Sequence, residues 1–93
     1  MPKLSQNDID AALQTLPGWS QENDVIRKQY SFGNFAAALE FVNRVAEAAE
    51  AADHHPDIDI RYNKVTLALS THSVGGLTEK DVALAREIES MIS

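Results

Sequence analysis

Two short runs with apolar residues at every second position constrain the fold of this chain more than any other feature. They span residues 58–62 and 65–69, and Asn63 and Lys64 separate them. An alternation of period two is typical of a β-strand that buries one face. A connection of two polar residues predicts a tight hairpin between the strands. The sequence therefore predicts an antiparallel hairpin with its turn at Asn63 and Lys64, in which Tyr62 faces Val65.

A second hairpin and three helices are indicated around this one. Residues 19–21 and 25–32 have the composition of strands on either side of a polar turn at 22–24. Helical spacing of apolar residues marks the segments 5–16, 35–52 and 79–92. The order helix, hairpin, helix, hairpin, helix predicts an α+β fold. We expect a four-stranded antiparallel sheet with three helices, in the order α-β-β-α-β-β-α.

Capping residues support the helix boundaries. Ser5, Asn34 and Thr78 are the expected N-caps of the three helices. Ser5 and Thr78 are each followed three residues later by an Asp, which is close to the spacing of a capping box. The Pro17-Gly18 pair is expected to stop the first helix.

Size and composition bound what the chain can be. Its 93 residues suffice for one domain, 1–93, and the net charge of −6 with no long basic run argues against nucleic acid or an anionic membrane as a partner. No cysteine is present, which excludes disulfides, thiolate zinc sites and cysteine nucleophiles. No apolar run approaches the ~20 residues of a membrane span, and no hydrophobic signal region opens the sequence. A soluble, cytoplasmic protein is expected.

The middle helix is rich in alanine. Eight of the 17 residues from 36 to 52 are alanine, while Phe35, Leu39, Val42, Val45 and Ala49 share a helical phase. Alanine favours helix and allows another helix to approach closely. We therefore expect a subunit contact along this helix, and with it a homo-oligomer. Trp19 is expected in the core or at a subunit contact, with the lining of a pocket as an alternative.

The three histidines are predicted to meet at one end of the hairpin. With the turn at Asn63 and Lys64, position 72 falls opposite position 55, so His72 returns to the neighbourhood of His54 and His55. A shift of one or two residues in register would not change that result. Glu50, Asp53 and Asp81 add acidic groups to this cluster.

Such a cluster could perform acid–base chemistry. An imidazole with a pKa of about 6.5 gives or takes a proton at neutral pH. Two imidazoles on opposite sides of a small molecule could eliminate water from a carbinolamine, one removing a proton and the other protonating the departing hydroxyl. Two other interpretations stay open here. The histidines could be solvated or cap a helix end, or the three could hold zinc, although adjacent histidines are poorly spaced for one ion.

The spacing of these residues resembles that of the pterin-4a-carbinolamine dehydratases. The pattern is an acid, three residues, His-His-Pro, five residues, an aromatic residue, nine residues, a His and then an Asp. Four segments extend the resemblance over nearly the whole chain: 16–19 (Leu-Pro-Gly-Trp), 62–65 (Tyr-Asn-Lys-Val), 69–72 (Leu-Ser-Thr-His) and 76–81 (Gly-Leu-Thr-Glu-Lys-Asp). The residues that carry the signature are Glu50, His54, His55, Pro56, Tyr62, His72 and Asp81.

The resemblance implies an activity. Enzymes of this family are hydro-lyases that dehydrate the 4a-hydroxytetrahydropterin released by aromatic amino acid hydroxylases. The product is quinonoid dihydropterin, and the reaction serves tetrahydrobiopterin recycling. They need no metal or organic cofactor, they have an α+β fold with a four-stranded sheet, and many assemble as homotetramers.

The resemblance also implies roles for particular residues. His54 and His72 match the proposed acid–base pair, without a decision as to which is acid and which is base. His55 matches a histidine that helps to bind the substrate. Other residues that would support or line the pocket are Glu50, Asp53, Pro56 and Asp81, whereas Lys80 stands where some relatives carry arginine.

Two other functions stay open from the sequence. Vertebrate relatives also serve as a dimerisation partner for a homeodomain transcription factor, so a non-catalytic interaction module is one alternative. The other alternative is a dehydratase-like protein that acts on a different pterin.

Overall fold

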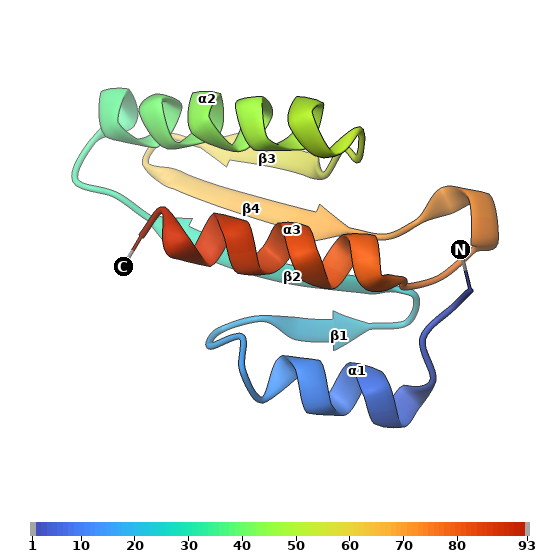
Figure 1. Cartoon of the computed structure of the whole chain (residues 1–93). Coiled ribbons are helices and arrows are strands. Elements are labelled where there is room, and N and C mark those ends of the chain that lie inside the picture. Colours follow the sequence, from blue (N-terminus) through green and yellow to red (C-terminus); the bar gives the residue numbers. More distant parts are fainter. Residues whose placement is uncertain (1, 93) are drawn as a thin grey trace.

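The computed structural model describes residues 2–92, and its elements follow the predicted order (Figure 1). They are α1 (Gln6–Leu13), β1 (Ser20–Glu22), β2 (Val25–Ser31), α2 (Phe35–Ala52), β3 (Asp57–Arg61), β4 (Lys64–Leu69), a short 3₁₀ turn (His72–Val74) and α3 (Glu79–Ser90). The strands form one antiparallel sheet in the order β1-β2-β4-β3. The predicted α+β fold is confirmed. None of the described helices is both long and apolar enough to cross a membrane.

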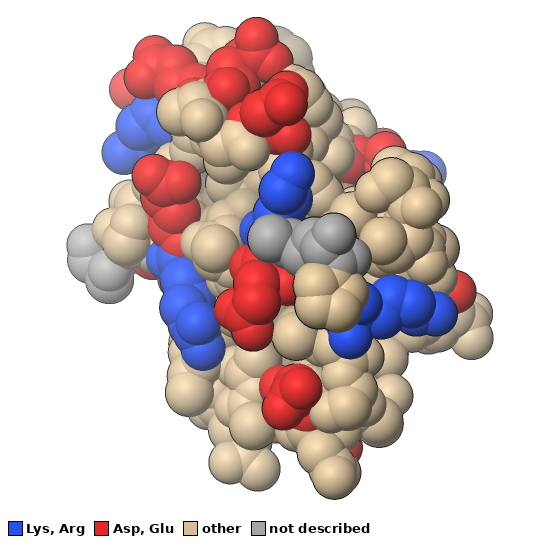
Figure 2. Space-filling view, turned by 45° about the vertical axis from the view of Figure 1, so that its right-hand side comes forward, with Lys and Arg blue, Asp and Glu red and all other residues tan. Residues whose placement is uncertain are grey.

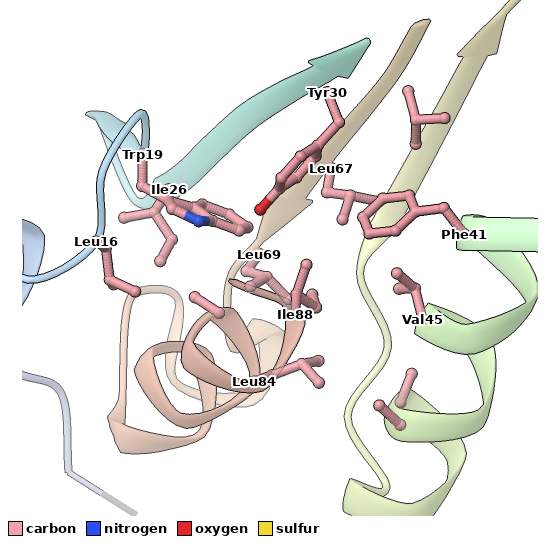
Figure 3. Close-up of a cluster of buried hydrophobic side chains, with 14 of the residues drawn as sticks. Leu16, Trp19, Ile26, Tyr30, Phe41, Val45, Leu67, Leu69, Leu84 and Ile88 are labelled. Atoms are coloured by element: carbon pink, nitrogen blue, oxygen red, sulfur yellow. The ribbon is translucent and has the colours of Figure 1, made fainter. Parts of the chain in front are cut away.

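The core lies between the sheet and the helices α2 and α3, which pack against each other (Figure 3). Along the central strand β4, Val65, Leu67 and Leu69 are fully buried, whereas the residues between them are not. This alternation places one face of β4 in the core. Trp19 is also buried there, in agreement with the prediction of a place in the core. Helix residues complete the cluster, among them Phe41, Val45, Leu84 and Ile88.

The predicted N-caps are confirmed. The Ser5 side chain accepts from the backbone N–H of Asp8, and Asn34 Oδ1 accepts from Ala37. At the start of α3 the capping box is complete. The Thr78 side chain accepts from the backbone of the first helical turn, and the Asp81 side chain accepts from the backbone N–H of Thr78. Helix α1 ends at Leu13, three residues earlier than predicted. The next residues form turns instead, in which the Thr15 hydroxyl donates to a helix carbonyl.

The hairpin turn of β3 and β4 lies one residue earlier than predicted. Tyr62 and Asn63 form the turn, and Arg61 faces Lys64, so the predicted pairing of Tyr62 with Val65 is wrong. The two registers differ by two residues and leave every side chain on the same face, so the apolar alternation cannot distinguish them. Asn63 favours the observed one. Its side chain donates to the Phe32 carbonyl over 2.7 Å, and its own carbonyl accepts from Phe32 N.

The five apolar residues of α2 that share a helical phase are not all in the core. Val45 and Ala49 are buried and Val42 is half-buried, whereas Phe35 and Leu39 are exposed. Ala38 and Phe41 of the same helix are also buried in the core. Helix α2 lies over the β3 side of the sheet in Figure 1. The exposed large apolar residues of α2, β3 and the adjoining turn, here called the apolar edge, are Phe35, Leu39, Ile58, Ile60 and Tyr62.

Candidate active site

The end of helix α2 presents the first two histidines. Asp53 ends the helix in the left-handed conformation, with φ at 51°. Its backbone N–H bonds to the Glu50 carbonyl and that of His54 to the Ala49 carbonyl, which closes the last turn. The chain then leaves the helix axis and enters β3 through Pro56. His54 and His55 therefore lie directly after the helix, at a pocket that Ser70 and Thr71 after β4 also line.

The third histidine lies on a closed loop between β4 and α3. Thr71 and Gly76 bond to each other's backbone and close the loop at its base. His72 begins the 3₁₀ turn inside this loop, and Gly75, with φ at 64°, reverses the chain. A residue with a side chain would be strained at that φ. The loop therefore holds His72 beside the end of α2.

All three histidines line one open pocket of about 260 Å³, which is near the lower end of the range for small-molecule sites. The sequence therefore predicted their meeting correctly, although its register was shifted by two. Of the predicted acids, Asp53 lines the pocket, whereas Glu50 and Asp81 are not among its lining residues, nor is Pro56. The other described lining residues are Ser70, Thr71, Ser73 and Lys80.

Asp81 lies behind His54, not on the pocket wall. The carboxylate is fully buried, and its Oδ1 lies 2.5 Å from His54 Nε2. Its Oδ2 accepts from the Thr71 hydroxyl over 2.8 Å and from Thr78 N over 3.0 Å. Because a carboxylate only accepts hydrogen bonds, we assign the hydrogen of the His54 contact to Nε2.

The other ring nitrogen of His54, Nδ1, is accessible from the pocket. No described residue hydrogen-bonds to Nδ1, yet no buried side-chain nitrogen or oxygen of residues 2–92 lacks a partner. Nδ1 is therefore accessible, and His54 lines the pocket. With the ring neutral and its hydrogen on Nε2, Nδ1 carries a lone pair. This atom can accept a proton from a bound molecule.

His55 and His72 have different surroundings. His55 Nε2 lies 2.5 Å from Glu50 Oε2, and both side chains are largely exposed. A contact so exposed adds little stability, but it orients the imidazole. The His72 side chain is exposed, and no described residue hydrogen-bonds to it. The pocket thus contains three histidines in different environments. His54 is buried and bonded to a carboxylate, His55 is exposed and bonded to a carboxylate, and His72 is exposed without a carboxylate partner among the described residues.

Charge along α2 and directly after it is mostly negative. Glu40, Glu47, Glu50 and Asp53 are exposed on α2 or directly after it. Figure 2 shows acidic side chains gathered at the top of the molecule, where α2 lies. Within residues 2–92, no three His, Asp or Glu side chains are arranged so that they could hold a metal ion.

Sequence reasoning singled out no role for Ser70, Thr71 or Ser73, which line the pocket beside His72. Their position next to His72 was a usable signal, because residues that flank a site residue in a tight loop share its pocket. The contact of Thr71 with Asp81 had no such signal. It depends on how the loop closes onto α3, and no periodicity encodes that closure.

Comparison with known proteins agrees with this site. The family model described as "Pterin 4 alpha carbinolamine dehydratase" matches residues 2–91. A protein of Thermomicrobium roseum, named "Putative pterin-4-alpha-carbinolamine dehydratase", is 52% identical over 93 residues and covers the whole of both chains. A protein of Chloroflexus aurantiacus with the same name is 55% identical over 92 residues, or 99% of each chain.

Solved structures agree as well. A Brucella melitensis protein, described as a "transcriptional coactivator/pterin dehydratase", superposes with a TM-score of 0.95 at 33% identity, covering 99% of this chain and 100% of that one. A second structure is described as a pterin dehydratase-like protein that is a RuBisCO assembly factor. It superposes with a TM-score of 0.64 at 20% identity over 77% of this chain and 83% of that one, which shows the shared fold alone. From the family match, the curated relatives and the Brucella structure, this chain belongs to the pterin-4-alpha-carbinolamine dehydratase family.

Proposed function

We propose that this protein dehydrates 4a-hydroxytetrahydropterin, the pterin-4a-carbinolamine, to quinonoid dihydropterin and water. One observation carries the proposal. Three histidines from two segments of the chain line one pocket of small-molecule size, and Asp81 holds one of them with a ring nitrogen open to that pocket. Asp53 and Lys80 line the pocket with opposite charges, which suits a neutral ligand such as a pterin ring.

Proton transfer at two atoms accounts for the reaction. His54 Nδ1 takes the proton from N5 of the pterin, because its lone pair is open to the pocket while Nε2 is occupied by Asp81. His72 gives a proton to the hydroxyl on C4a, because its exposed ring lines the pocket and no described residue hydrogen-bonds to it. The C4a–O bond breaks, water leaves, and the N5 electrons form the N5=C4a double bond. Each general acid or base contributes about 10²–10⁴-fold.

The remaining predicted residues bind and position the substrate. His55, oriented by Glu50, presents a ring nitrogen at the pocket mouth. Asp53 offers carboxylate oxygens to the amino and ring N–H groups of the pterin. Pro56 fixes the exit from the helix end, and Asp81 holds His54. Neither a metal ion nor an organic cofactor takes part in this scheme.

The same proposal gives the protein a cellular role and an assembly state. It would recycle tetrahydropterin in the cytoplasm together with an aromatic amino acid hydroxylase that supplies the substrate. The apolar edge, composed of Phe35, Leu39, Ile58, Ile60 and Tyr62, supports a homo-oligomer, either a dimer or a homotetramer. Exposed apolar groups of this size on adjacent elements are typical of protein interfaces.

The apolar edge also supports a second candidate function, that of a protein-interaction module. The residues of this surface do not line the histidine pocket. Binding of a partner protein there would therefore be independent of His54 and His72. A partner that binds His54→Ala and His72→Ala variants as well as it binds the wild type would support this second role.

The decisive experiment follows the ultraviolet absorbance of freshly generated 4a-hydroxytetrahydropterin as it decays. We expect wild-type protein to accelerate the decay, and His54→Ala and His72→Ala to lose most of that acceleration. Lys64→Ala, at the far end of β4 from the pocket, is the control and should match the wild type. Folded histidine variants with full activity would refute the catalytic assignment. Folded wild-type protein without activity would refute the proposed reaction and favour a different pterin or the interaction role.

A further inference from the structure

The hydroxyl of Thr71 joins the two histidine-bearing parts of the pocket. Its oxygen donates to Asp81 Oδ2 over 2.8 Å, and the other carboxylate oxygen receives His54 Nε2. We propose that Thr71 is a positioning residue, which holds His54 through Asp81 while its backbone holds the loop that carries His72. The inference deepens the proposed function, on which it rests, because it concerns the geometry of the proposed acid and base.

The hydrogens of this network can be placed in only one way. Thr71 Oγ1 lies 2.8 Å from Thr78 Oγ1 and also contacts Asp81. A hydroxyl has one hydrogen, and only a donor can face a carboxylate. Thr71 therefore gives its hydrogen to Asp81, and the Thr78 hydroxyl gives its own to Thr71. Asp81 accepts from Thr71, Thr78 N and His54.

Burial makes this arrangement hard to replace. Thr78 and Asp81 are fully buried, and Thr71 is 7% exposed. Water cannot readily stand in for the Thr71 hydroxyl, so its loss would leave Asp81 Oδ2 short of a donor and Thr78 short of an acceptor. The carboxylate would then be held only by Thr78 N and His54, so its Oδ1 would be less firmly placed against His54 Nε2. The preference of the ring hydrogen for Nε2 would weaken with it.

The backbone of Thr71 fixes the other histidine. Thr71 N donates to the Gly76 carbonyl over 2.8 Å, and the Thr71 carbonyl accepts from Val74 N over 3.2 Å. These bonds frame the 3₁₀ turn that begins at His72. A single residue thus ties the position of His72 to that of His54 through one side chain and one loop closure.

Three variants separate the hydroxyl from the shape of the side chain. Thr71→Val keeps the branched shape and removes the hydroxyl, whereas Thr71→Ser keeps the hydroxyl and removes the methyl group. Thr66→Val makes the same chemical change on β4, where the Thr66 hydroxyl accepts only a 3.3 Å bond from exposed Gln29. Long-range ¹H–¹⁵N spectra of the histidine rings show which nitrogen carries the hydrogen, without any substrate. Dehydration kinetics give kcat and KM.

We expect Thr71→Val to move the His54 hydrogen partly to Nδ1 and to lower kcat on the order of 10–100-fold, as when outer partners of metal-binding histidines are removed. KM should change little, because the hydroxyl bonds Asp81 and Thr78 and is not offered to the substrate. Thr71→Ser and Thr66→Val should keep both the wild-type ring spectrum and the wild-type kcat.

Other outcomes would overturn the proposal. Thr71→Val with the hydrogen still on Nε2 and an unchanged kcat would show that the hydroxyl positions nothing. If wild-type protein lacks dehydratase activity, the proposed function fails, and the ring spectra still decide whether Thr71 holds His54. If Thr71→Val does not fold, Thr71→Cys replaces it with a weak donor of similar size. A His54 spectrum of Thr71→Cys identical to that of Thr71→Ser would then count against the proposal.

Discussion

Lys28 Nζ lies 2.7 Å from Glu89 Oε2, and this contact ties the last helix to the sheet. The same carboxylate oxygen accepts from the hydroxyl of Tyr30 and from the indole N–H of Trp19. Lys28 also donates to the Pro17 carbonyl over 2.6 Å. One partly buried acid on α3 therefore gathers side chains from β2 and from the turn before β1.

Glu89 is expected to make the stability of the fold depend on pH. Burial raises its pKa, but the hydrogen bonds from Lys28, Tyr30 and Trp19 and the charge of Lys28 outweigh burial, so its pKa lies below the ordinary 4.5. The folded state then favours the charged form. This contribution is fully present above pH 4.5 and is lost as the pH falls through the lowered pKa.

Glu89→Gln should remove that pH dependence. We expect the variant to lose about 1–3 kcal/mol of unfolding free energy at pH 7. Toward pH 3 its difference from the wild type should shrink, because the wild-type carboxyl becomes protonated. Urea unfolding followed by Trp19 fluorescence measures the unfolding free energies of the variant and the wild type at each pH. Glu87→Gln, on the exposed side of the same helix, is the control. Equal losses at both pH values would contradict the prediction.

Two adjacent glycines in the His72 loop should respond differently to alanine. Gly75 has open space around it but a φ of 64°, so Gly75→Ala should cost about 1–2 kcal/mol of strain. At Gly76 a new Cβ would lie 2.6 Å from Cε of Lys3, the far part of a flexible side chain that can move aside. Gly76→Ala should therefore cost less. Urea midpoints of the two variants test this order, and a larger loss for Gly76→Ala would reverse the explanation.

Most of the fold was predictable because local signals were strong and agreed. Ser5, Asn34 and Thr78 mark helix starts by capping chemistry that acts within one turn. The errors arose where local signals were equivalent. The alternation of apolar residues fits two hairpin registers equally, and contacts of Asn63 with the distant Phe32 favour one of them. Phe35 and Leu39 keep helical phase, but the placement of α2 on the sheet leaves them exposed.

The candidate site was predictable in its members more than in its architecture. The hairpin itself returns His72 to the end of α2, so the gathering of histidines followed from spacing. The burial of Asp81 behind His54 was not predictable, because one carboxylate makes two unrelated contacts. It completes the cap of α3 and it bonds His54, and it can do both only because α3 packs against the loop.

The apolar edge should be the surface that joins subunits. Ile60→Lys places a charge on the exposed edge strand β3, a device by which sheet edges avoid association. We expect wild-type protein to sediment as a dimer or tetramer and the variant to sediment as a smaller species with unchanged far-ultraviolet circular dichroism. Gln29→Lys, at an exposed position of the inner strand β2, should leave the assembly intact. A wild-type protein that sediments as a monomer at micromolar concentration would exclude this role for the surface.

Asp81→Asn should separate the structural task of the carboxylate from its effect on His54. With its amide oxygen in place of Oδ2, the new side chain can still accept from Thr78 N and from Thr71, and its NH₂ group then faces His54. A donor facing His54 would require the lone pair on Nε2 and move the ring hydrogen to Nδ1, the atom proposed as the base. We therefore expect kcat to fall by about 10⁴, as for the corresponding change in a serine protease triad, with a loss of about 1–3 kcal/mol in stability.

Asp53→Asn is the matched control for that change, because Asp53 is exposed, lines the same pocket and makes no side-chain hydrogen bond to His54. It should raise KM more than it lowers kcat, since its carboxylate is proposed to bind the substrate. Steady-state kinetics at a temperature well below both unfolding midpoints keep the stability loss of Asp81→Asn out of the comparison. If both variants lowered kcat equally, Asp81 would have no specific effect on His54 as the base. Another group of the pocket would then have to accept the N5 proton of the pterin.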